Sequence, residues 1–130
     1  MQVDAVTIRQ PLAQITGTAR RTRAAGFSGL LFTETGRTTY LNAAIAPQAA
    51  PGLQLSMGVA VVSPREAVRH SGRGVGTARA SNGNIRRGLG TQVRTHVVRR
   101  YGVEVRTPGP RLRECGQSAS SPMLRSSCQS

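Results

Sequence analysis

The spacing of hydrophobic side chains changes several times along the first third of the chain. Residues 2–6 alternate between polar and apolar side chains, which predicts a short strand. From residue 11 the spacing becomes helical, because Leu12, Ile15 and Ala19 fall on one face of a helix. Residues 29–33, "GLLFT", form a continuous apolar run, which is typical of a strand buried on both faces.

A second group of elements follows. Residues 40–50 have a helical composition, although Pro47 should end or kink the helix. Residues 53–62, "LQLSMGVAVV", contain the clearest strand pattern in the sequence. Ser63 and Glu66 then match a capping box, which predicts the start of another helix.

Strands and helices therefore alternate through the first 70 residues. Such alternation predicts an α/β fold in which parallel strands are joined by right-handed helical crossovers. Segments of this size occur both in TIM barrels and in doubly wound sheets, and periodicity alone leaves both open.

The regular pattern stops at residues 70–84, which are rich in glycine and arginine and should be irregular. Residues 85–89 predict a short strand, and residues 91–100 predict a helix after it. The two prolines in residues 107–115 indicate a turn followed by a helix start. Residues 115–130 are rich in serine and should form a disordered tail.

The charge of the chain raises the question of nucleic-acid binding. The 130 residues include 18 basic side chains against 5 acidic ones, for a net charge of +13, yet every basic side chain is arginine. Phosphate-binding surfaces usually contain lysine as well, and stacking on bases needs more aromatic residues than the 3% present here. The arginines are also scattered, so the composition resembles that of a GC-rich coding sequence more than a selected basic face.

The cysteines and the lengths of the apolar stretches indicate the compartment of the protein and its relation to membranes. Cys115 and Cys128 lie in the polar tail without the spacing of a metal site or a disulfide framework, so we expect a reduced cytoplasmic protein without a metal. No window approaches eighteen apolar residues, and the first residues lack a charged region followed by an apolar one. We therefore expect neither a membrane span nor a signal peptide.

Three stretches give the sequence a family resemblance: "AAGFSGLLFTET" at residues 24–35, "LQLSMGVAVV" at residues 53–62, and "GLGTQVRTHVVRRYGVEVRTPGPRLRE" at residues 88–114. In this order and spacing they resemble the luciferase-like flavin- or deazaflavin-dependent oxidoreductases. The resemblance implies a TIM barrel, a small-molecule substrate, and FMN or coenzyme F-420 as cofactor.

The resemblance also implies where a cofactor would bind, namely at the ends of the second, third and fourth strands. In the family, the third strand contains a backbone bulge, often with a non-proline cis peptide, beneath the flavin ring, and Gly58–Val59 occupies that position. A polar group near the ring edge would correspond to Glu34. The full set of implied cofactor-binding residues is Glu34, Met57, Gly58, Val59, Gly90, Thr91 and Gln92. No catalytic residue is implied.

The sequence departs from the family in extent. A full barrel has eight strands in about 250 residues, whereas we expect about four βα units here, over residues 1–114. This predicts a partial TIM barrel from a truncated or degenerate copy, and we hypothesise a frameshift origin for residues 67–84 and 115–130. Exposed barrel edges would favour homo-oligomers. A basic nucleic-acid-binding protein and an inactive remnant without a cofactor are the alternatives.

Overall fold

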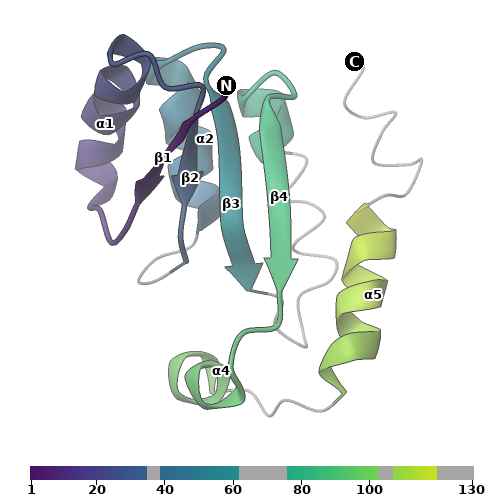
Figure 1. The fold of residues 1–130 in the computed structure, drawn as a ribbon. Coiled ribbons are helices and arrows are strands. Elements are labelled where there is room, and N and C mark those ends of the chain that lie inside the picture. Colours follow the sequence, from purple (N-terminus) through teal and green to yellow (C-terminus); the bar gives the residue numbers. More distant parts are fainter. Residues whose placement is uncertain (35–38, 62–75, 103–106, 120–130) are drawn as a thin grey trace.

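A computed structural model describes residues 1–34, 39–61, 76–102 and 107–119 of the chain (Figure 1). The elements alternate as the hydrophobic pattern predicts, and a short helical stretch at residues 76–80 precedes the fourth strand. In chain order they are β1 (Asp4–Thr7), α1 (Leu12–Ala24), β2 (Gly29–Phe32), α2 (Thr39–Ala49), β3 (Gln54–Val61), β4 (Ile85–Gly90), α4 (Arg94–Tyr101) and α5 (Pro108–Ala119).

The four strands form one parallel sheet in the order β1-β2-β3-β4. One row of paired residues crosses the whole sheet, from Thr7 through Phe32 and Met57 to Arg87. Because neighbouring strands run in the same direction and in sequence order, their carboxyl ends meet at one edge of the sheet. This is the α/β arrangement of the first units of a TIM barrel, and it confirms the fold class expected from the sequence.

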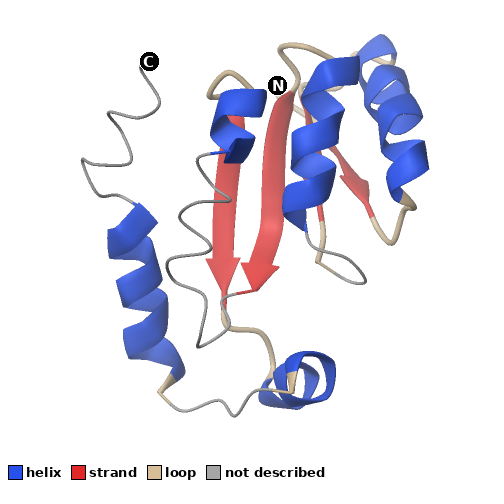
Figure 2. Ribbon diagram, turned by 180° about the vertical axis from the view of Figure 1, so that it is seen from behind, coloured by secondary structure: helices blue, strands red, loops and turns tan. Residues whose placement is uncertain are grey.

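The hydrophobic core lies between the sheet and the two helices α1 and α2, which cover the same side of it (Figure 2). Alternate residues of β2 and β3 point toward these helices, which explains why Leu30 and Phe32 are fully buried. The helices contribute small and medium-sized side chains to the same cluster: Ile15, Ala19, Tyr40, Ala43 and Ala46.

The opposite side of the sheet is less covered. Val6 is 59% exposed, and Leu31, its partner on β2, is half-buried. Asp4 lies on the same side. A Cβ added to Gly29, which shares the side of Leu31 on β2, would lie 2.6 Å from the Oδ1 atom of Asp4. In a barrel this side of the sheet faces the interior.

Helix α2 differs from expectation at Pro47. The helix continues through this proline to Ala49, so Pro47 does not end it. Ala43, Ala46 and Ala50 are all buried, and the Ala50 N–H donates to the Ala46 carbonyl at 3.1 Å. Core packing therefore holds the last turn of the helix although the proline donates no hydrogen bond.

Three sequence-based boundaries require correction. Residues 76–80 are helical rather than irregular, and residues 115–119 belong to α5 rather than to a disordered tail. Helix α4 begins at Arg94, not at residue 91, because Gln92 has a positive φ of 58° and Val93 is extended. The helix expected after Ser63 and the remaining tail, residues 120–130, lie outside the described residues.

Candidate functional site

The most irregular part of the sheet is a bulge in β3. Met57 pairs with Arg87, but the next aligned pair is Ala60 with Leu89, so β3 contains one residue more than β4 over this interval. The extra residue falls at Gly58–Val59, where the peptide bond is cis. A bulge at this position was expected from the family resemblance, and the structure confirms it.

Three glycines surround the bulge, and each is packed closely against a neighbouring strand. A Cβ on Gly88 would lie 2.5 Å from the Met57 carbonyl oxygen, and one on Gly90 would lie 2.8 Å from Cγ2 of Val59. A Cβ on Gly58 would approach the Leu31 side chain to 3.1 Å. The "GLG" motif thus permits close packing of β4 against the bulge, which is a structural reason for glycine at both positions.

Glu34 reaches the bulge from the neighbouring strand. It follows the end of β2, and its Oε2 accepts a hydrogen bond of 2.8 Å from the backbone N–H of Val61 at the end of β3. Val61 in turn pairs with Gly90 on β4, and Thr91 comes next in the chain. Glu34, the bulge and Thr91 are therefore brought together at the carboxyl edge. We call this group, Glu34 with residues 57–61 and 88–92, the bulge site.

The other cofactor-binding residues implied by the resemblance differ from one another in how exposed they are. Met57 is only 2% exposed and its side chain belongs to the hydrophobic core, so only its backbone faces the bulge site. Val59 and Thr91 are half-buried, whereas Gln92 is exposed on the loop before α4. The side chains of the set thus do not all point to one surface.

Sequence reasoning missed several polar groups at the same edge. The Thr33 hydroxyl donates to the Thr7 carbonyl at 3.0 Å, and the Thr7 hydroxyl donates to the Leu31 carbonyl at 3.2 Å. These hydrogen bonds tie the ends of β1 and β2 together beside Glu34. The signal in the sequence was a polar residue directly after an apolar run, which is common in any strand end.

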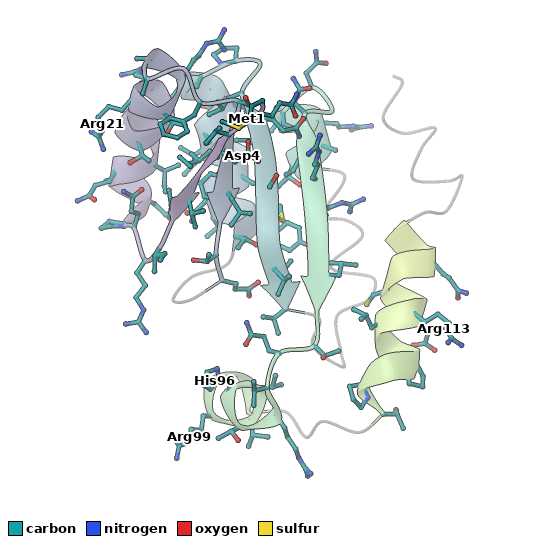
Figure 3. The ribbon with its side chains drawn as sticks, in the orientation of Figure 1. Met1, Asp4, Arg21, His96, Arg99 and Arg113 are labelled. Carbon is teal, nitrogen blue, oxygen red and sulfur yellow. The ribbon has the colours of Figure 1, made fainter. Side chains whose placement is uncertain are left out.

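The charged side chains outside the bulge site are dispersed. Arg21 on α1, Arg99 on α4 and Arg113 on α5 lie in separate parts of the molecule, and Asp4 lies at the amino end of β1 (Figure 3). His96 extends from α4, and within the described residues no three His, Cys, Asp or Glu side chains are grouped to hold a metal ion.

Cys115 is also placed differently from expectation. It lies in α5 and is only 4% exposed, rather than in a polar tail. Burial raises the pKa of its thiol above the ordinary value of 9.0, and the neighbouring Glu114 carboxylate raises it further. The side chain is therefore a neutral thiol at physiological pH.

Comparison with known proteins agrees with this geometry. The family model for luciferase-like monooxygenases matches residues 1–118. The chain belongs to the luciferase-like monooxygenase family. The match runs from β1 through most of α5 and includes the whole bulge site. No curated protein matches the chain.

Membership of the family gives the general class of the protein, which is that of the monooxygenases and hence of oxidoreductases. No helix among the described residues has the length and apolar character needed to cross a membrane.

Proposed function

We propose that the bulge site binds the ring system of FMN or coenzyme F-420, and that the chain is an oxidoreductase acting on a small-molecule substrate. A cytoplasmic setting, expected from the cysteine usage, is part of the proposal. When bound, such a cofactor supplies the hydride or oxygen chemistry, while the protein binds and orients it.

The observation that carries the proposal is the bulge at Gly58–Val59 within a family whose members are monooxygenases. A bulge in a strand turns backbone groups out of the regular ladder, so they become available to a ligand. It lies at the carboxyl edge of parallel strands, where α/β barrels bind their ligands.

The residues at the bulge fit a planar ring. Gly58 has no side chain of its own on the interior side of the sheet, and the Leu31 side chain packs against it there, so a flat group would rest on Leu31 beside the bulge. Thr91 supplies a hydroxyl at the end of β4, and half-buried Leu31 and Val59 offer apolar surface to a ring face. These residues would bind and orient the ring, while Glu34 and the two threonines Thr7 and Thr33 hold the strand ends.

A fluorescence titration of purified monodisperse protein tests the proposal. FMN and coenzyme F-420 are added separately at two ionic strengths, and quenching of cofactor fluorescence reports binding. We expect saturable binding of one cofactor with a much weaker dependence on salt than DNA binding shows, because packing and hydrogen bonds hold the ring and the cofactor carries only a few phosphate or carboxylate charges.

A pair of glycine variants serves as the matched control. Gly58→Val adds a side chain that meets Leu31 on the ring-facing side of the bulge and should abolish binding, while an unchanged circular dichroism spectrum shows that the variant still folds. Gly116→Ala adds a methyl group at an open position inside α5 and should leave binding unchanged. Absence of binding to wild type would support an inactive remnant, and affinity for DNA that falls steeply with salt would support the nucleic-acid alternative.

A further inference from the structure

The ladder between β2 and β3 ends before β3 does. The last pair between these strands is Phe32 with Met57, yet β3 continues for four more residues to Val61. Within the part of the chain that the structure describes, β3 pairs over those residues with β4 alone, through Ala60 and Val61. Its backbone groups on the side of β2 therefore need acceptors and donors from outside the regular sheet.

Glu34 provides such an acceptor for Val61. Its Oε2 accepts the Val61 N–H at 2.8 Å across 27 positions of sequence, and Val61 itself is only 4% exposed. A buried N–H left without an acceptor is costly, and a hydrogen bond to a carboxylate is stronger than one to a neutral oxygen. The carboxylate thus replaces the strand carbonyl that β2 no longer offers.

We propose that Glu34 is a positioning residue that fixes the carboxyl end of β3 and so holds the bulge in its ligand-binding shape. It acts on the cofactor through the Val61 amide and the Gly58–Val59 backbone, and not by placing its charge against the ring. This inference rests on the proposed function for its effect on cofactor binding, but the hydrogen bond itself exists without any ligand.

Two conservative substitutions separate the two roles of this side chain. Glu34→Gln keeps an acceptor oxygen at the same reach but removes the charge. Glu34→Asp keeps the charge but shortens the side chain by one methylene, so its oxygen no longer reaches Val61. A positioning role is therefore rescued by glutamine and lost with aspartate, whereas a role for charge beside the ring gives the opposite order.

The first measurement is amide hydrogen exchange in the protein without cofactor, compared among wild type and both variants. We expect the Val61 amide to exchange about tenfold faster in Glu34→Asp, which loses the hydrogen bond, and no more than about threefold faster in Glu34→Gln, which keeps a weaker bond to a neutral oxygen. The amides of Leu30 and Leu55 in the core should be unchanged, which separates a local opening from general unfolding. Equal protection of Val61 in all three proteins would overturn the proposal.

The second measurement is the affinity for the cofactor that wild type binds. We expect Glu34→Asp to weaken binding about tenfold and Glu34→Gln to remain within about threefold of wild type. Asp4→Ala is the control, because it removes one carboxylate from the same sheet at the opposite edge and should not alter binding. Weaker binding by Glu34→Gln than by Glu34→Asp would overturn the positioning role.

The two measurements also separate the failure of this inference from failure of the proposed function. If wild type binds neither cofactor, the proposed function is wrong, and the exchange of Val61 still decides whether Glu34 holds the end of β3. If wild type binds but both variants bind equally well, the proposed function stands and Glu34 has no positioning role.

Discussion

The two strand pairs that share β3 differ in how they are held together. The β2–β3 pair has an unbroken register from Gly29 to Phe32 and buries large apolar side chains against α1 and α2. The β3–β4 pair contains the bulge, and no residue of β4 is fully buried. The first pair supplies most of the large buried side chains, while the second adds Ile85 and Leu89 at the margin of the same core and depends on glycines that let the backbones approach. The candidate site therefore lies beside the centre of the core, in a chemically different part of the same sheet.

The largest effect should follow from removing core volume in the β2–β3 pair. Phe32 is fully buried, so Phe32→Ala should lower the free energy of unfolding by about 3–5 kcal/mol through lost burial and an unfilled cavity. Leu89→Ala in β4 should cost about 1–2 kcal/mol, because Leu89 is half-buried. Urea unfolding followed by circular dichroism measures both. Equal losses would show that the two pairs contribute alike.

A smaller effect should follow from adding volume in the β3–β4 pair. Gly88→Ala should lower the free energy of unfolding by about 1–3 kcal/mol, because the new methyl group meets the Met57 carbonyl oxygen at 2.5 Å. Gly116→Ala, at an open position inside α5, is the matched control and should leave the free energy of unfolding unchanged or raise it by up to about 1 kcal/mol. If the free energy of unfolding of Gly88→Ala equalled that of the control, the close packing of β4 against the bulge would not contribute to stability.

The outer strand β1 differs from both strand pairs, because it offers an exposed edge through which copies of the chain could associate. We propose that copies of the chain associate through the exposed barrel edges, because β1 pairs only with β2 among the described strands and Ile8 beside it is 66% exposed. Ile8→Arg should weaken self-association about tenfold, since one large apolar side chain no longer becomes buried. Sedimentation equilibrium measures this, and a wild-type protein that stays monomeric at all concentrations contradicts the proposal.

The smallest expected effect concerns Cys115 in α5. Because burial raises the pKa of this thiol when the chain is folded, the folded state disfavours the thiolate. Its contribution to stability is present in full below pH 9.0 and is lost as the pH rises through the higher folded value. Wild type should thus lose more stability than Cys115→Ser between pH 8 and pH 11 in thermal unfolding. Parallel curves for the two proteins would show that the thiol is not buried.

The sequence predicted the β1–β3 region well and the later region less well. Apolar runs such as residues 29–33 and 53–62 specify buried strands almost regardless of context. Helix α2 was predicted apart from the effect of Pro47, because tertiary packing of its alanines outweighs the loss of one backbone hydrogen bond. Residues 76–80 and 115–119 carry weak helical signals, so their helical structure could not be inferred from periodicity.

The candidate site was predictable only in part. The bulge followed from the resemblance at Gly58–Val59, but nothing in the local sequence reveals that Glu34 bonds to Val61, because that contact depends on where the β2–β3 ladder ends. In contrast, the alternation of side chains along a strand could have indicated that the Met57 side chain faces the helices, since Met57 lies in the same row of the sheet as Phe32. A residue such as Met57, which lies next to the bulge in the sequence, can thus contribute only its backbone to the bulge site.

The most direct test of the central claim is a map of amide chemical shifts on adding FMN or coenzyme F-420 to isotopically labelled protein. We expect the changes to concentrate at residues 57–61 and 88–92, with little change in α1 or α5. Changes confined to the arginine-bearing helices, or no saturable changes with either cofactor, would contradict the assignment of the bulge site as the place where the ring binds.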